Sequence, residues 1–249
     1  MSERRKLHPP RPSEMIEAIE VVKTFGPFRA LDTITLLLPE GQWGVLYGPN
    51  GAGKTTLIKI LATLMRPTEG TVRIMGFEAT KEPDSIRRKI GLIGHHTHLY
   101  EDLTARENLA FTTALYGVSH RSERIERALK QVELTDWRDA TVRILSNGMK
   151  KRLALARVMV IEPRLLLLDE PYAGLDARSR ELLTSYLVFF KEGGGTILLS
   201  THHPQELAAA PVDRLYALGR GRLERDEVVS DVEDWAGTLE RIVTGGLSS

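Results

Sequence analysis

A glycine-rich stretch of nine residues, GPNGAGKTT at positions 48–56, constrains the fold of this chain more than any other segment. It fits the pattern G-x-x-x-x-G-K-[ST], follows the apolar run WGVLYG and precedes the helix-like TTLIKILATLM, which is the context that this pattern requires. Gly48, Gly51 and Gly53 allow the loop to curl with its backbone N–H groups pointing inward. Together with the start of the following helix, these donors form a cradle for phosphate groups.

The side chains of this loop predict how it holds a nucleotide. Lys54 reaches the β- and γ-phosphates as a point charge, and the Thr55 hydroxyl ligates Mg²⁺. An accidental glycine-rich turn is the alternative, and the flanking strand and helix argue against it. The residues expected to bind the nucleotide are those of the whole loop: Gly48, Pro49, Asn50, Gly51, Ala52, Gly53, Lys54, Thr55 and Thr56.

A second motif, LLLLDEP at residues 165–171, ends a buried strand with two acids. Ligands bind at the carboxyl ends of the strands in an open α/β sheet. Asp169 is therefore the expected partner of Mg²⁺, directly or through water. Glu170 is placed to polarise the water that attacks the γ-phosphate. A solvated acid pair without a ligand is the alternative, and the phosphate-binding loop in the same chain disfavours it.

Hydrophobic periodicity predicts how these motifs are arranged. Buried strands are predicted where short apolar runs end at turn signals, at 43–48, 90–94, 165–169 and 196–201. Strands of a smaller, antiparallel sheet are predicted at 34–41 and 70–76. Between about residues 104 and 160 the apolar residues recur at helical spacing. This order predicts a helical subdomain inserted in a doubly wound α/β core.

Composition excludes several classes of protein. The 249 residues are 42% hydrophobic and 27% charged, which is ordinary for a soluble globular protein. A net charge of +1 gives no reason to expect a nucleic-acid partner. The absence of cysteine excludes disulfides and thiolate zinc sites. No run of 18 apolar residues and no secretory signal occur, so we expect a cytoplasmic protein.

Three further motifs complete an ordered set, namely LSNGMKKRLALARVM (145–159), AGLD (173–176) and STHH (200–203). With the two motifs above, the set resembles the ATP-binding subunits of ABC transporters over about residues 14–225. The resemblance implies an α/β fold with a P-loop NTPase (RecA-like) core, an antiparallel β subdomain and a helical subdomain inserted at about 95–160. Residues 1–13 would form a flexible N-terminal arm, and residues 226–249 a C-terminal extension.

The resemblance also implies roles for individual residues. Ser146 and Gly148 match the signature motif, which contacts the γ-phosphate held by a second subunit. Asp176 matches the acid of the D-loop at the dimer interface, and Phe25 matches the aromatic that stacks on adenine. His202 matches the switch histidine that positions the attacking water. The expected catalytic residues are then Glu170, His202 and Lys54.

Two subunits would sandwich two ATP molecules head to tail, so hydrolysis would require a dimer, either a homodimer or a heterodimer. A separate integral membrane subunit is implied, with the ATPase peripheral on the inner face of the cell membrane. The signature departs from the usual LSGGQ at Asn147 and Met149. Asn tolerates unusual backbone angles, so we expect the loop to survive.

The segment LYEDLTARENLAF, together with the histidine in the preceding loop and the signature variant, resembles the ATPase of the haem exporter used in cytochrome c maturation. An ATPase of a multidrug or polysaccharide exporter, a soluble ABC-type ATPase and a non-enzymatic nucleotide-binding module are the alternatives. The cargo and the direction of transport are not encoded in an ATPase sequence, because the membrane subunit handles the cargo.

The segment GHHTHL at 94–99 aligns with the loop whose key residue in the family is usually glutamine. His95 takes the glutamine position, so it is expected to sense the γ-phosphate and to approach Mg²⁺ directly or through water. Mg²⁺ prefers hard oxygen ligands, which favours a weakened contact. A transition-metal site built from His95, His96 and His98 is the alternative.

The last segment contains DVEDWAGTLERIV, which predicts one amphipathic helix with Val232, Trp235, Leu239 and Ile242 near one face. We expect it to cap the core, with a dimer contact as the alternative.

Overall fold

Two β-sheets and a group of helices make up the chain, for which a computed structural model describes residues 14–94, 97–207 and 210–229. The central sheet has the strand order β10-β9-β3-β8-β7-β6. Strands β9, β3, β8, β7 and β6 run parallel to one another, and the edge strand β10 is antiparallel to β9. They are β3 (Trp43–Tyr47), β6 (Ile90–Ile93), β7 (Leu165–Asp169), β8 (Thr196–Thr201), β9 (Arg214–Gly219) and β10 (Arg222–Val228).

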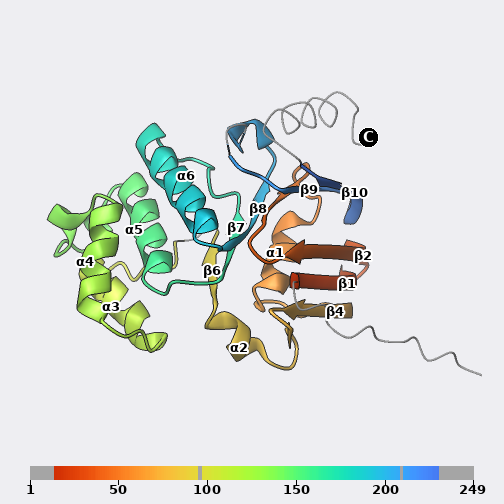
Figure 1. Cartoon of the computed structure of the whole chain (residues 1–249), viewed down its shortest axis with the longest axis horizontal. Coiled ribbons are helices and arrows are strands. Elements are labelled where there is room, and N and C mark those ends of the chain that lie inside the picture. The colour runs from red at the N-terminus through yellow and green to blue at the C-terminus, as the bar shows by residue number, and fades with distance from the viewer. Residues whose placement is uncertain (1–13, 95–96, 208–209, 230–249) are drawn as a thin grey trace, which may run out of the picture.

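The smaller sheet is antiparallel and has the order β2-β1-β4-β5. Its strands are β1 (Glu14–Phe25), β2 (Phe28–Pro39), β4 (Glu69–Ile74) and β5 (Phe77–Glu78). Helix α1 (Lys54–Leu61) lies between the two sheets, and its apolar side chains pack in one core with residues of both (Figure 1).

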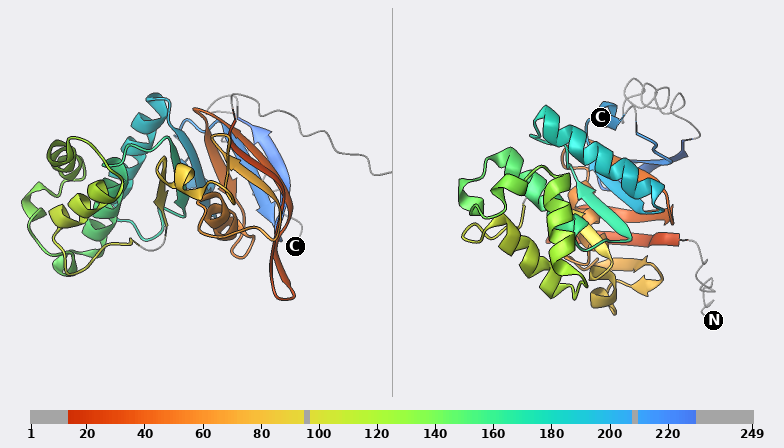
Figure 2. Two further views of the ribbon diagram at one scale, coloured as in Figure 1. Left: turned by 90° about the horizontal axis from the view of Figure 1, so that it is seen from below. Right: turned by 60° about the vertical axis from the view of Figure 1, so that its left-hand side comes forward.

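Of the remaining helices, α2 packs beside β5 and β6 in the core that contains α1, whereas α3 to α6 pack in the core on the other face of the central sheet. Helices α3, α4 and α5 gather at the end opposite the antiparallel sheet, as Figures 1 and 2 both show. Helix α6 packs against β8 and α5. The bounds are α2 (Pro83–Arg87), α3 (Ala105–Leu115), α4 (Arg121–Gln131), α5 (Asn147–Met159) and α6 (Ala177–Glu192), with 3₁₀ turns at Thr135–Trp137, Val142–Ile144 and Pro204–Leu207.

The central strands are apolar throughout because both of their faces are covered. Along β7, Leu165 and Leu167 pack in the core that contains α1. Leu166 and Leu168 pack in the core that contains α3 to α6. Side chains alternate between the faces of a strand, so a strand that is buried on both faces is a continuous apolar run.

The predicted fold class is confirmed, and the four predicted buried strands are present as β3, β6, β7 and β8. The smaller sheet is antiparallel as predicted, but β2 begins at Phe28 rather than at residue 34. Strands β1, β9 and β10 had not been predicted. β10 runs to Val228, beyond the expected end of the ATPase domain at 225.

Within the described ranges, none of the helices has the length and apolar character needed to cross a membrane. The predicted N-terminal arm and the predicted C-terminal amphipathic helix lie outside the described residues.

Candidate functional site

The phosphate-binding loop connects β3 to α1, in the context predicted from the sequence. Gly51 and Gly53 have φ angles of +82° and +103°, which side chains rarely adopt. A Cβ atom on Gly48 would lie 2.2 Å from the carbonyl oxygen of Leu218, and one on Gly53 would lie 2.7 Å from that of Ala30. These glycines are therefore required by the close approach of neighbouring strands as well as by the curl of the loop.

Lys54 begins α1 and is only 4% exposed. Its Nζ donates to the carbonyl oxygens of Gly48 at 2.7 Å and Pro49 at 3.1 Å, both in the phosphate-binding loop. The same nitrogen lies 3.4 Å from Oε1 of Glu170. The lysine charge thus lies within reach of both the loop that holds phosphate and the carboxylate that follows β7.

Oxygen ligands suited to Mg²⁺ converge where β7 and β8 end beside α1. The Thr55 hydroxyl donates to both Asp169 oxygens, at 2.9 and 3.1 Å. The Ser200 hydroxyl donates to Oδ1 of Asp169 at 2.7 Å. Two hydroxyls and a 5%-exposed carboxylate are the hard donors that Mg²⁺ takes, so the residues present fit the metal.

Ser200 was missed in the sequence analysis. The available signal was its position: a hydroxyl residue near the end of the apolar strand TILLST, which lies next to the strand that carries Asp169.

Glu170 lies in the turn that follows β7. Its φ angle of +49° is in the left-handed region, which is uncommon for a residue with a side chain. Its backbone N–H donates to the carbonyl and the hydroxyl oxygen of Ser200, both at 3.1 Å. Its Oε2 lies 3.1 Å from Nδ1 of His202, a close approach that does not meet hydrogen-bond geometry. The carboxylate is therefore placed between Lys54 and His202.

The signature residues form the start of α5. The Ser146 hydroxyl caps the helix by accepting the Met149 N–H at 3.2 Å. Asn147 is the first helical residue and does not have a positive φ angle, so the tolerance of asparagine for unusual angles is not needed. Met149 packs its side chain against the core. The two departures from the usual signature are thus accommodated by an ordinary helix start.

Asp176 caps the next helix, α6, and lies against the signature glycine. Its Oδ1 accepts the Ser179 N–H at 2.7 Å, and this bond lowers the pKa of Asp176 below its ordinary value. A Cβ atom on Gly148 would lie 2.4 Å from Oδ2 of Asp176. Ser146, Gly148 and Asp176 thus form a second cluster, at the N-termini of two adjacent helices.

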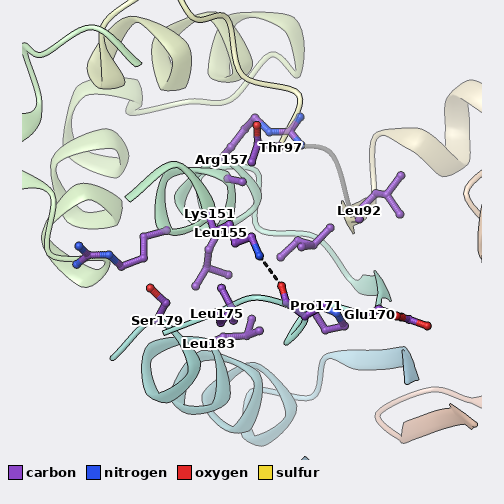
Figure 3. A pocket seen from close by; sticks show the side chains of 15 residues that line it. Leu92, Thr97, Lys151, Leu155, Arg157, Glu170, Pro171, Leu175, Ser179 and Leu183 are labelled. Atoms are coloured by element: carbon purple, nitrogen blue, oxygen red, sulfur yellow. Dashed lines mark hydrogen bonds between the residues drawn. The ribbon is translucent and has the colours of Figure 1, made fainter. Parts of the chain in front are cut away.

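A cavity separates α5 from the turn that follows β7 (Figure 3). It encloses about 670 Å³ of space between protein atoms, part of it open to solvent. Leu155 and Leu183 line it from α5 and α6, and Glu170 lies at its edge. Lys151 crosses it and donates to the carbonyl oxygen of Ala173. The Lys151 hydrogen bond therefore links the signature helix α5 to the turn after β7 across this cavity.

Of two further residues predicted to bind the nucleotide, the structure describes Phe25 but not His95. Phe25 ends β1 and is 46% exposed, with Nζ of Lys23 at 5.2 Å from its ring centroid. Stacking of Phe25 on adenine stays a prediction. His95 and His96 lie outside the described residues. In the described part of the chain, no three His, Cys, Asp or Glu residues are grouped as a metal site.

Comparison with known proteins identifies the class that this fold and site define. The sequence profile of the ABC transporter family matches residues 31–173. This match covers more than half of the chain, which therefore belongs to the ABC transporter family as an ATP-binding cassette.

Named relatives come from different transporters. The chain is 38% identical over 231 residues to the daunorubicin/doxorubicin resistance ATP-binding protein DrrA of Streptomyces peucetius, covering 92% of this chain and 69% of that protein. It is 35% identical over 224 residues to the sulfate/thiosulfate import ATP-binding protein CysA of Synechococcus elongatus, covering 88% and 64%. The chain thus spans about two thirds of the length of these relatives.

Solved structures agree with this assignment. An ATP-binding subunit of an ABC transporter superimposes with a TM-score of 0.81 at 29% identity, covering 90% of this chain and 93% of that one. The cassette MJ0796, solved as a dimer in a post-hydrolysis state with ADP and Pi, has a TM-score of 0.79 at 30% identity, covering 87% and 100%. The chain is thus an ATPase that binds ATP and uses Mg²⁺, in a family whose cassettes dimerise and work with membrane subunits.

Proposed function

We propose that this chain is the ATP-hydrolysing subunit of an exporter of small amphipathic molecules, of the drug-resistance type. The observation that carries the proposal is the 38% identity to DrrA across 92% of the chain. The chain would act as a pair of cassettes on the inner face of the cell membrane, bound to a separate integral membrane subunit. The pair would be a homodimer or a heterodimer.

Within this function we assign the chemistry to the residues at the carboxyl edge of the central sheet. Thr55 and Asp169 would hold Mg²⁺, which would supply positive charge to neutralise the phosphates. Lys54 stabilises the same phosphates from the loop. Glu170 accepts the proton of the attacking water, and His202 holds that water in line. The contacts of Glu170 with Lys54 and His202 support this assignment because they put all three groups in one place.

The second cluster would complete the site of the partner cassette. Ser146 and Gly148 offer a helix N-terminus with a small residue beside it, which suits the approach of a phosphate. Asp176 lies against Gly148 and would share the dimer interface. Phe25 would stack on the adenine. His95 stays the predicted sensor of the γ-phosphate and of Mg²⁺.

Two other interpretations differ in the cargo or in the chemistry. The ATPase of a haem exporter for cytochrome c maturation is the second candidate, although none of the relatives reported above is a haem exporter. A non-enzymatic binding module is disfavoured, because Lys54, Glu170 and His202 are all present and close together.

Two experiments test the proposal. The tagged chain is first purified from solubilised membranes of its native cells, and we expect one integral membrane protein in a fixed ratio. Cells expressing both subunits should then retain less daunorubicin than cells in which the ATPase carries Glu170→Gln. Equal retention, or loss of c-type cytochromes when the gene is deleted, would exclude the drug-export function.

A further inference from the structure

One carboxylate joins the helical end of the molecule to the start of α6. Glu133 lies in the turn after α4 and accepts the Arg178 Nε–H at 3.1 Å, together with a second, shorter bond from Nη2. It also accepts from Nη1 of Arg152 at 3.4 Å. Arg152 belongs to the signature helix α5, and Arg178 belongs to α6. Glu133 therefore connects the two helices that begin at the signature motif and at Asp176.

The geometry distinguishes this contact from an ordinary surface ion pair. Single exposed pairs contribute little to stability. Here the guanidinium of Arg178 binds through two N–H groups, which fixes its orientation as well as its distance. Nη1 of Arg152 also donates to the carbonyl oxygen of the preceding residue, Val132, at 3.2 Å, so Arg152 binds this turn at two adjacent residues.

Arg178 has two carboxylate partners, one on its own helix and one on another element. It lies in the first turn of α6, directly after the Asp176 cap, and the helix dipole disfavours a positive charge there. Glu181, one turn further along the same helix, accepts from Nη1 at 2.7 Å. This second bond is local to α6, so among the described residues Glu133 is the carboxylate that ties Arg178 to another element.

The position of α6 relative to α5 matters because the functional groups at their starts are in contact. Asp176 lies so close to Gly148 that a Cβ atom added to Gly148 would come within 2.4 Å of the Asp176 carboxylate. A small rotation of either helix would therefore change the surface that Ser146, Gly148 and Asp176 present together.

We propose that Glu133 is a positioning residue for ATP hydrolysis, which sets Asp176 relative to Ser146 and Gly148 through Arg178 and Arg152. The residue touches no nucleotide and acts only through the two arginines. The inference rests on the proposed role of the second cluster in completing the site of the partner cassette.

Glu133→Gln tests this role, because it removes the charge and keeps the side-chain size. We expect kcat of the purified chain to fall about five- to tenfold, with KM for ATP within about twofold. ATP-dependent dimerisation, measured by analytical ultracentrifugation in a Glu170→Gln background, should weaken by a similar factor. Glu181→Gln is the matched control, since it removes a bond to the same arginine without separating the helices, and it should change neither quantity.

A double-mutant cycle tests whether Glu133 affects kcat through Arg178. If Glu133 works through Arg178, the variant with Glu133→Gln and Arg178→Gln should be no slower than either single variant. Additive losses, an unchanged kcat in Glu133→Gln, or an equal loss in Glu181→Gln would overturn the proposal. A fall in melting temperature with unchanged kcat and dimerisation would show a structural role only and would also overturn it. These results are independent of drug export, which is measured separately in cells.

Discussion

Replacing Lys54 by methionine removes the buried charge of the phosphate-binding loop and keeps the length of the side chain. The ammonium group makes hydrogen bonds of 2.7 and 3.1 Å to loop carbonyls and lies 3.4 Å from Glu170. A hydrogen bond to a charged group contributes about 1.5–3 kcal/mol. Loss of one such bond to phosphate should therefore weaken ATP binding about 10- to 150-fold. Hydrolysis should fall further, because the lysine also faces the charge that develops during phosphoryl transfer.

Isothermal titration with ATP and Mg²⁺ measures the first effect, and phosphate release measures the second. Lys59→Met is the matched control, because Lys59 lies on the same helix α1 and is exposed. We expect the control to bind ATP like the unmodified chain. An affinity of Lys54→Met within threefold of the unmodified chain would refute the placement of this lysine at the phosphates.

Three further predictions follow from single contacts. Gly48→Ala places a Cβ atom 2.2 Å from the Leu218 carbonyl oxygen, so we expect the free energy of unfolding to fall by about 1–3 kcal/mol and ATP binding to weaken. An unchanged melting temperature would contradict this prediction. Thr104→Ala removes the capping box with Glu107, which should cost about 1 kcal/mol and about 2–4 °C in melting temperature without changing KM for ATP. Asp169→Asn should raise the Mg²⁺ concentration needed for hydrolysis, and chelation of Mg²⁺ should abolish hydrolysis in the unmodified chain. Hydrolysis that persists in chelator would exclude this use of the metal.

The central strands were predictable because burial on both faces leaves a simple signal. β7 and β8 are apolar runs that end at turn residues, and their observed bounds match the predicted ones. β1 gives no such signal, because its register shifts between Ile19 and Val22 and Glu20 has a positive φ angle. β10 is an edge strand with the polar sequence RLERDEV. It carries no apolar pattern, and its pairing with β9 defines it as a strand.

In the candidate site, too, some features were predictable from the sequence and others were not. Lys54, Thr55, Asp169 and Glu170 were predictable because each stands next to a strand or helix end within one short motif. The glycine contacts with neighbouring strands were not predictable, because Gly48 meets a carbonyl 170 positions later in the chain.

The ion pairs of Glu133 could not be found from the sequence either. Arg178 follows Glu133 by 45 positions, and the two meet only because the helical end packs onto α6. Neither residue lies in a motif, so no pattern of residue types marks the contact.

Phosphate release by the purified chain and by its Glu170→Gln variant, at saturating ATP and Mg²⁺, tests the catalytic site most directly. Glu170 lies between Lys54 and His202 and is the carboxylate placed to take a proton from the attacking water. General-base action contributes about 10²- to 10⁴-fold, so we expect the variant to hydrolyse ATP at least about 100-fold more slowly, with its ATP affinity retained. A variant that hydrolyses ATP at the unmodified rate would contradict the assignment of Glu170 as the base.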